Sequence, residues 1–363
     1  FPDIPPFPSD VPTAPLLRIS LAKLLQEDAD ELDRLWQACC DLGFFYIDLR
    51  SDGAANGHEG SAGSANVSIN GTQLLRDADE LFEVQKKFFE LPVEEKLKYD
   101  FSEKGLYHGY KGYGATNIDI KGNKDRNEFY NISKDDIIGV TPPLPAPSAL
   151  DPDRPLLRSF INNSHALTIL VLSILNDRLS LPPNTLPSLH RLNAVAGDQV
   201  RFIRAPPQPP DDRKITLGEH TDFGSVTVLF NRVGGLQVRL PKYVQPILPA
   251  SHNGADTADQ ENWAYVVPVA GHAIVNLGDA IVKFTAGLLR SNIHRVVNPP
   301  GAQADTTRYS LVYFSRPEDE VVLRTVGGSR LVEEQKERLG LEEGEGEGVT
   351  AKVWINRRAM ARR

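Results

Sequence analysis

The stretch GEHTDFGSVTVLF, residues 218–230, places an imidazole and a carboxylate two positions apart at the head of an apolar, β-branched run. In an extended strand the side chains of residues i and i+2 point to the same face. His220 and Asp222 can therefore reach one metal ion from one strand. A His-x-Asp pair by itself is also common among surface polar residues, so the metal interpretation depends on what the rest of the chain supplies.

A third ligand is available in SNIHRVV, residues 291–297, which contains His294. Two histidines and one carboxylate on one side of an octahedral ion leave its opposite side open, and this arrangement is typical of non-haem Fe(II) oxygenases. The sequence therefore predicts an iron site made by His220, Asp222 and His294.

Downstream, the run RYSLVYF, residues 308–314, repeats the two-residue period with Arg308 and Ser310. A planar guanidinium beside a hydroxyl is suited to two-point recognition of a carboxylate. The alternative is an exposed arginine paired with a surface acid. The tyrosine, leucine, valine and phenylalanine around the pair indicate a buried strand instead. We therefore expect a carboxylate-binding site here.

With these residues and Gly278-Asp279 in order, the chain resembles the iron- and 2-oxoglutarate-dependent dioxygenases of the isopenicillin N synthase-like superfamily. The resemblance runs from CDLGFF, residues 40–45, to about Pro317. It implies a mainly β fold, a double-stranded β-helix (jelly roll) with peripheral helices. It also implies that Fe(II), 2-oxoglutarate and O₂ are used, with Arg308 and Ser310 holding the distal carboxylate of 2-oxoglutarate. The expected reaction is hydroxylation, desaturation or cyclisation of a small organic molecule, as in fungal secondary metabolism.

The sequence departs from the family before the proline at the end of QVRFIRAP, residues 199–206. Many relatives carry an asparagine and a tyrosine where this chain has Ile203 and Ala205. Two alternatives therefore stay open. One is an oxidase of the same fold that uses O₂ without 2-oxoglutarate, and the other is a non-enzymatic jelly-roll protein that binds a small molecule. The complete set of three metal ligands argues against the second.

Composition bounds the class of protein. The 363 residues carry a net charge of −8, which argues against nucleic acid or an anionic membrane as the main partner. We interpret the basic stretch 351–363 as a solvated terminal helix.

The longest apolar run, residues 166–175, is too short to span a bilayer. The only two cysteines, Cys39 and Cys40, are adjacent and form no disulfide framework, which fits a reduced, cytoplasmic setting. We expect the protein to be a monomer. Because the chain starts at Phe1 and not at a methionine, we expect that some leading residues have been lost.

Periodicity divides the chain into three parts. Residues 1–140 are expected to hold N-terminal helices and flanking strands, with a Gly/Ser-rich flexible insertion at 51–72. Residues 156–330 are expected to form the catalytic jelly roll, braced by one long apolar helix from about residue 160 to residue 181. Residues 331–363 are expected to form a helical tail.

Five residues near the motifs are candidates for the lining of a substrate pocket. Tyr113 lies in a Gly/Tyr-rich loop, and the others flank the motif strands. They are Phe223, Lys283, Phe314 and Arg316. The sequence does not identify the substrate.

Overall fold

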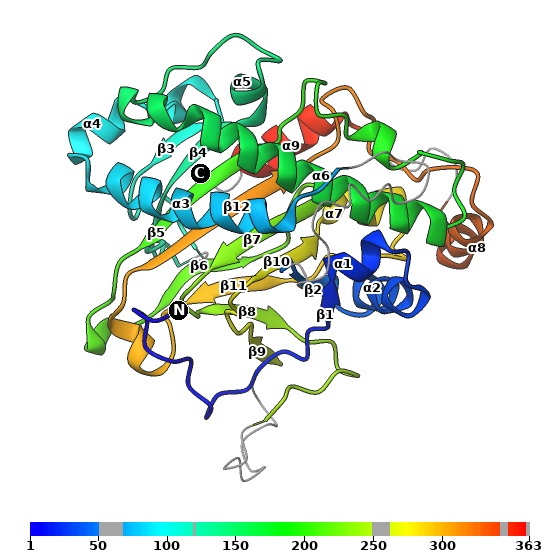
Figure 1. Ribbon diagram of the computed structural model, residues 1–363, viewed down its shortest axis with the longest axis horizontal. Coiled ribbons are helices and arrows are strands. Elements are labelled where there is room, and N and C mark those ends of the chain that lie inside the picture. The colour runs from blue at the N-terminus through cyan, green and yellow to red at the C-terminus, as the bar shows by residue number, and fades with distance from the viewer. Residues whose placement is uncertain (51–67, 119–120, 249–261, 342–347, 361–363) are drawn as a thin grey trace.

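The computed structural model describes residues 1–50, 68–118, 121–248, 262–341 and 348–360. Within them two β-sheets face each other (Figure 1). The larger sheet has eight strands, in the order β1 (Arg18–Ser20), β2 (Phe44–Asp48), β10 (His272–Leu277), β7 (Val226–Asn231), β12 (Arg308–Ser315), β5 (Gln199–Ala205), β4 (Glu128–Ser133) and β3 (Gly109–Lys111). The smaller sheet has four, in the order β6 (Ile215–His220), β11 (His294–Val297), β8 (Leu236–Arg239) and β9 (Trp263–Tyr265). Apart from the β1–β2 pair, neighbouring strands run antiparallel.

Helices occupy more of the described residues than strands do, so the expectation of a mainly β protein was wrong and the fold is mixed. The α-helices are α1 (Leu21–Leu25), α2 (Ala29–Asp41), α3 (Gly71–Glu90), α4 (Val93–Leu97), α5 (Lys134–Ile138), α6 (Arg154–Arg178), α7 (Asp279–Phe284), α8 (Arg330–Leu339) and α9 (Ala351–Met360). Short 3₁₀ turns lie at Ser102–Lys104, Ser148–Asp153, Pro187–Leu189, Pro210–Asp212 and Gly301–Asp305.

Strand β12 shows how the sequence assigns the two faces of the large sheet. Of its odd-numbered residues, Leu311 and Tyr313 are fully buried in the main hydrophobic core on the side that α3 and α6 cover, and Tyr309 packs against this core partly buried. Its even-numbered residues, from Arg308 to Phe314, point instead into the space between the two sheets. The outer face of β12 therefore belongs to the core, and its inner face is available for a ligand. Elsewhere the inner face of the large sheet packs against the small sheet, as Tyr46 and Ile274 do.

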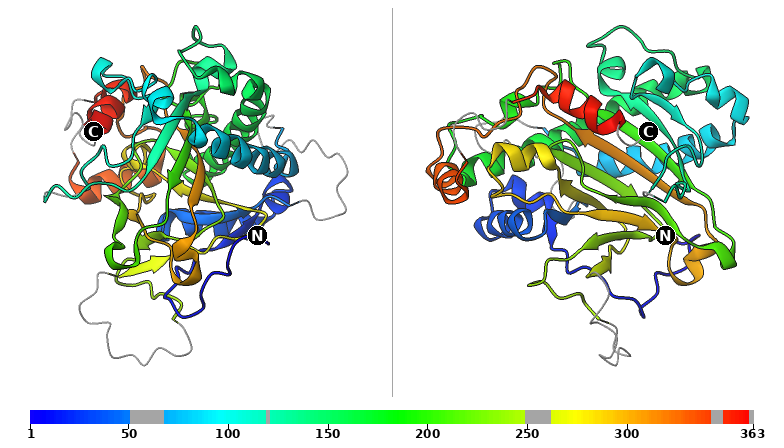
Figure 2. Two further views of the ribbon diagram at one scale, coloured as in Figure 1. Left: turned by 90° about the vertical axis from the view of Figure 1, so that its left-hand side faces the viewer. Right: turned by 180° about the vertical axis from the view of Figure 1, so that it is seen from behind.

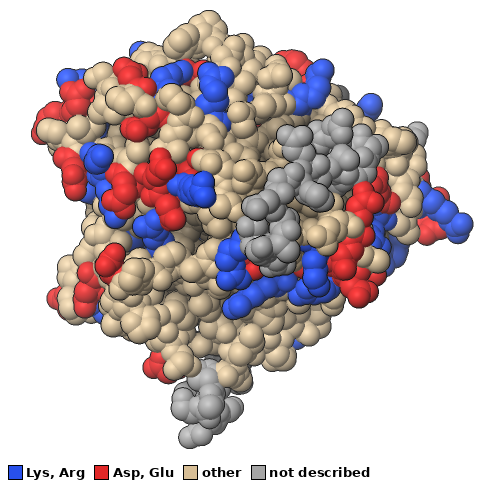
Figure 3. Space-filling model, viewed as in Figure 1, with Lys and Arg blue, Asp and Glu red and all other residues tan. Residues whose placement is uncertain are grey.

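The long helix α6 braces the large sheet, as the apolar pattern predicted, although it begins and ends a few residues earlier than expected. A proline in its first turn is tolerated because the first helical amides have no partner within the helix. Helices α3 and α6 run side by side across the outer face of the sheet (Figures 1 and 2). On the exposed side of α3, acidic and basic side chains alternate (Figure 3), and Lys86 pairs with Glu83 at 2.7 Å.

The N-terminal region contributes directly to the large sheet, because β1 to β4 all belong to it. Gly43 ends α2 in the left-handed conformation at φ +64°, and a Cβ there would lie 1.9 Å from the Arg290 carbonyl oxygen. The insertion expected at 51–72 lies mostly outside the described residues, and its last two positions belong to α3. Among the helices that the structure describes, none is both long and apolar enough to cross a membrane.

Candidate metal centre and co-substrate site

The two histidines of the predicted iron site lie on neighbouring strands of the small sheet. His220 is the last residue of β6, His294 is the first residue of β11, and the two are direct partners in the antiparallel register. Their ring centroids lie 4.1 Å apart. The two histidines therefore stand on the same wall of the barrel. Asp222 does not share a strand with His220, since it follows β6 in the loop that leads to β7.

Each imidazole is oriented by a hydrogen bond on the ring nitrogen farther from the centre. His220 Nδ1 lies 2.8 Å from the Gly218 carbonyl oxygen, and His294 Nδ1 lies 3.1 Å from that of Asn292. A carbonyl only accepts, so each Nδ1 donates and each Nε2 is left as the nitrogen with a lone pair. Carbonyl partners of this kind fix the tautomer of histidines that bind metals.

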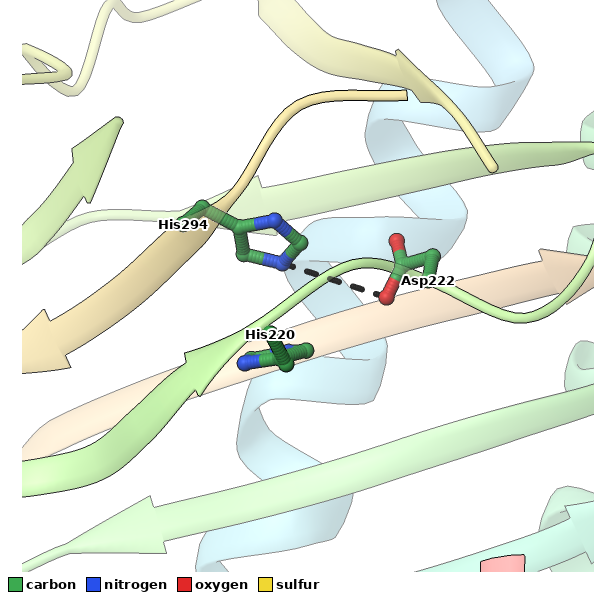
Figure 4. Close-up of side chains that lie close together, drawn as sticks. All are labelled: His220, Asp222 and His294. Carbon is green, nitrogen blue, oxygen red and sulfur yellow. Dashed lines mark ion pairs between the residues drawn. The ribbon is translucent and has the colours of Figure 1, made fainter. Parts of the chain in front are cut away.

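The two oxygens of the Asp222 carboxylate have different partners. Its Oδ2 accepts hydrogen bonds from Thr227 Oγ1 and Asn276 Nδ2, both at 2.7 Å. Its Oδ1 faces His294 Nε2 at 3.8 Å (Figure 4). One ligand atom from each of His220, Asp222 and His294 can be chosen so that all lie within 4.8 Å of one another. Two imidazole nitrogens and one carboxylate oxygen suit a ferrous ion, so the residues present fit the group.

Burial acts to raise the pKa of Asp222. The nearby His294 and His220 and the hydrogen bonds from Asn276 and Thr227 outweigh it, so the pKa is lowered. The carboxylate therefore stays ionised near neutral pH, as a metal ligand must.

The Gly278-Asp279 motif holds the Asp222 loop in place. The first backbone amides of α7 donate to this loop, Asp279 N to Asp222 O at 2.8 Å and Ala280 N to Gly224 O at 3.0 Å. A Cβ at residue 278 would lie 2.3 Å from the Gly224 carbonyl oxygen, so only glycine allows the two segments to approach this closely. The motif therefore positions a ligand without being one.

Arg308 and Ser310 lie side by side on the inner face of β12, as the two-residue period predicted. The Arg308 side chain is 4% exposed and donates from Nε to the Gly234 carbonyl at 2.8 Å and from Nη1 to Ser310 Oγ at 2.6 Å. Burial lowers its pKa to about 10. Its register partner on β5 is Ala205, and that of Ser310 is Ile203, so both neighbours are apolar. Arg308 thus presents a buried cation in a fixed orientation, suited to bind an anion.

The sequence profile of the 2OG-Fe(II) oxygenase superfamily matches residues 197–317, and that of the non-haem dioxygenase N-terminal region matches residues 64–148. A 2-oxoglutarate-dependent dioxygenase of Aspergillus fumigatus is 34% identical over 319 residues, which are 86% of this chain and 78% of that protein. The chain belongs to the 2OG-Fe(II) oxygenase superfamily.

Further relatives and solved structures agree. The 2-oxoglutarate-dependent dioxygenase gloE of Glarea lozoyensis is 29% identical, covering 86% of this chain and 83% of that protein. The crystal structure of a Neurospora crassa protein in complex with alpha-KG superimposes with a TM-score of 0.69 at 22% identity, covering 95% of each chain. This likeness shows the shared fold, the double-stranded β-helix of 2OG oxygenases. The protein is a 2-oxoglutarate-dependent dioxygenase, and its cofactors are Fe(II) and 2-oxoglutarate.

In this dioxygenase the space between the two sheets holds a cavity of about 100 Å³. It is lined by the metal-binding triad, His220, Asp222 and His294, and by Arg308 and Ser310. Of the five pocket candidates, Phe223, Phe314 and Arg316 line it. Tyr113 does not. Its side chain is 52% exposed and borders a separate surface groove. Lys283 is not part of the cavity either. It lies in α7 with its ammonium 4.6 Å from the Trp354 ring.

The cavity residues that the sequence interpretation did not name include Tyr107 and Arg201. Arg201 could have been found from its even spacing with Ile203 on one strand, which puts both side chains on the inner face. Tyr107 belongs to the same Gly/Tyr-rich loop as Tyr113, and only the fold decides which tyrosine of this loop reaches the cavity.

The C-terminal helix α9 is not a purely solvated element, contrary to expectation. It packs beside the loop that carries Asp222, on the opposite side of the large sheet from α6 (Figure 2). Trp354 Nε1 donates to the Phe223 carbonyl at 3.3 Å, and Arg358 pairs with Asp279 at 2.7 Å. Arg358 also donates to Thr221 Oγ1 at 3.2 Å. The tail of this dioxygenase therefore supports the metal-ligand loop from outside.

Proposed function

We propose that this dioxygenase hydroxylates, desaturates or cyclises a small organic molecule of fungal secondary metabolism. In the proposed site His220, Asp222 and His294 hold Fe(II), and Arg308 and Ser310 bind the distal carboxylate of 2-oxoglutarate. The observation that carries the proposal is the composition of one cavity. It holds a metal-binding triad together with a buried arginine that lacks an acid among the described residues.

When bound, Fe(II) with 2-oxoglutarate and O₂ supplies the oxidant, while 2-oxoglutarate is converted to succinate and CO₂. The residues of the chain supply orientation. The Arg308 guanidinium is fixed by Gly234 and Ser310, so its remaining N–H groups are set to receive a carboxylate. Thr227 and Asn276 hold Oδ2 of Asp222, which leaves Oδ1 for the metal. The apolar Leu229, Val296 and Val312 exclude water from the space between these groups.

The experiment is an anaerobic titration of the Fe(II)-loaded protein with 2-oxoglutarate, followed by admission of O₂ and measurement of succinate. We expect saturable binding of 2-oxoglutarate and slow formation of succinate even without substrate. The matched control is His294→Ala, which should form none. If the iron-loaded wild type failed to bind 2-oxoglutarate, the proposed site would be refuted.

The three outcomes for the substrate are distinguished by its change in mass once a substrate is found. Hydroxylation adds one oxygen atom, whereas desaturation and cyclisation each remove two hydrogen atoms. Cyclisation is then separated from desaturation by counting double bonds.

A further inference from the structure

The cavity has a second cationic end that the triad and the 2-oxoglutarate site do not use. Arg201 of β5 and Arg316, directly after β12, both line it. Arg308 stands at the opposite end of β12. Arg201 lies across from Val312, four residue steps or about 13 Å of extended strand from Arg308, and the six steps from Arg308 to Phe314 span about 20 Å. A single molecule of 2-oxoglutarate held at Arg308 therefore does not account for Arg201 and Arg316.

Other buried cations in the described residues show what this fold does with a charge that has only a structural role. The buried lysines Lys96, Lys111 and Lys134 each form an ion pair with a carboxylate. Their partners are Glu128, Asp125 and Asp135. The buried arginines Arg308 and Arg316 form no ion pair within the described part of the chain. An unpaired buried charge costs folding free energy, so these two arginines are candidates to bind anions that come from outside the chain.

The side-chain hydrogen bonds of the second end all go to neutral acceptors. Arg201 donates from Nε to Asn131 Oδ1 at 2.7 Å and from Nη2 to the Tyr107 hydroxyl. Arg316, which is 4% exposed, donates from Nη1 to the Gly197 carbonyl. Its Nε has no acceptor among the described residues. These acceptors orient the two guanidinium groups, and neither group forms an ion pair with a carboxylate of the described residues. The carboxylates of Asp198 and Asp222 act on Arg316 only from beyond ion-pair distance.

We propose that Arg201 and Arg316 form a second carboxylate site and that the substrate of this dioxygenase is a small carboxylic acid bound there as its anion. The inference rests on the proposed function, since it assigns the substrate class of the same cavity. The planar guanidinium fork matches the two oxygens of a carboxylate.

Aromatic rings surround the two guanidinium groups and favour an organic acid over an inorganic anion. The guanidinium carbon of Arg201 lies 4.2 Å from the Phe129 ring centroid and 5.0 Å from that of Phe314. That of Arg316 lies 5.4 Å from the Tyr107 ring and 5.7 Å from the Phe314 ring. Such rings offer apolar contact to the carbon skeleton next to a carboxylate and little to a phosphate.

The strand register places this site on the metal side of the cavity. Phe314 pairs across the sheet with Thr227, whose hydroxyl binds the metal-ligand carboxylate of Asp222. A substrate anchored between Phe314 and Arg316 therefore has the bonds near its carboxyl group closest to the iron. We expect oxidation near the acid end and not at a remote terminus.

The test uses trifluoroacetate, the probe for a bare carboxylate, observed by fluorine NMR with the whole Fe(II)-loaded chain under anaerobic conditions. Saturating 2-oxoglutarate is added first, and its binding is measured by calorimetry, so that the Arg308 end is filled. We expect saturable broadening of the trifluoroacetate signal by the wild type. In Arg201→Gln and in Arg316→Gln the affinity should fall at least tenfold, while the affinity for 2-oxoglutarate stays the same.

The matched control is Arg204→Gln, the same change on the same strand but on the opposite face, where Glu128 keeps Lys96 as a partner. It should bind trifluoroacetate like the wild type.

If Arg316→Gln does not fold, the affinity for trifluoroacetate is compared in Arg316→Lys and Arg201→Gln instead. Absence of saturable binding to the wild type, or equal binding by the cavity variants, would overturn the inference. Displacement of the probe by inorganic phosphate at lower concentration than by acetate would also overturn it. Failure to bind 2-oxoglutarate would instead count against the proposed function.

Discussion

Strand β5 carries Arg201 and Arg204, whose side chains leave the large sheet on opposite faces. Arg204 lies across from Glu128 on the outer face and forms an ion pair with it. Arg201 lies across from Asn131 on the inner face and donates to its neutral amide oxygen at 2.7 Å. The same residue type on the same strand is thus neutralised within the chain on one face and left without an acid on the other.

The difference separates charges that stabilise the fold from charges that serve ligands. On the outer face Glu128 also binds Lys96 at 2.9 Å and accepts from the Tyr110 hydroxyl. The network is complete without any ligand. On the inner face, burial lowers the pKa of Arg308 to about 10, and the guanidinium still carries its charge at neutral pH. Replacing a charged residue on the inner face should therefore weaken ligand binding and change the free energy of unfolding little. Replacing one on the outer face should lower the free energy of unfolding and change ligand binding little.

The largest effect is expected for His294→Ala and His220→Ala on the inner face. Either change should abolish iron binding and turnover, because two ligands do not hold Fe(II) as three do. The free energy of unfolding of the metal-free protein should change little. Iron content after reconstitution and denaturant unfolding measure the two quantities. Wild-type iron content in either variant would remove that histidine from the ligand set.

On the outer face, Glu128→Ala leaves Lys96 and Arg204 without their acid. Breaking a buried ion pair from one side costs about 3–5 kcal/mol of unfolding free energy. Urea unfolding of the metal-free protein measures it. The matched control is Glu334→Ala, which breaks the exposed Arg330–Glu334 pair of α8 and should lower the free energy of unfolding far less. Equal losses in the two variants would contradict the distinction between the faces.

For Arg308→Ala, the expected loss is in affinity for 2-oxoglutarate. Removing one side of a buried charge pair costs about 2–5 kcal/mol, which is a factor of about thirty to several thousand. Arg308→Lys should recover only part, since a point charge lacks the fork of a guanidinium. Anaerobic titration of the Fe(II) protein gives the affinities, and iron binding should survive in both variants. An unchanged affinity in Arg308→Ala would remove this residue from the co-substrate site.

Two buried histidines predict how stability responds to pH. Burial lowers the pKa of His165 and of His190 to about 4. The unfolded chain therefore binds these protons first as the pH falls. The stabilisation is fully present above about pH 6.5 and is lost towards pH 4. Each histidine should lower the unfolding free energy by up to about 2 kcal/mol between pH 7 and pH 5.

Urea unfolding of the metal-free protein at pH 7 and pH 5 tests this prediction. His165 lies 3.4 Å from the Tyr313 hydroxyl on the outer face, so His165→Gln probes that face specifically. The variant should show a smaller difference between the two pH values than the wild type. An identical difference would mean that His165 does not contribute.

The smallest effect is expected at α9. Arg358→Ala removes a half-buried ion pair to Asp279 and a hydrogen bond to Thr221, which together should contribute about 1 kcal/mol or less. Because Thr221 and Asp279 position the Asp222 loop, we expect turnover to fall by a few-fold with the affinity for 2-oxoglutarate unchanged. Lys352→Ala, which breaks the α9 pair to Asp319, is the control and should leave turnover unchanged.

Local spacing in the sequence determined the parts of this protein that depend on one strand or one helix. Arg308 and Ser310 share a face because side chains in a strand repeat every two residues. The bracing helix was predicted on the same local grounds, since it depends on the conformation of consecutive residues. The family could likewise be identified from the order of the motifs along the chain.

Only the tertiary structure decided which strands pair and in what register. It made His220 and His294 direct partners within one sheet and placed Asp222 in a loop beside them. It also brought Arg201 and Arg316 into one cavity and packed α9 against the ligand loop. Pairing and register arise from burying the apolar faces of distant segments together, so no window of neighbouring residues contains them.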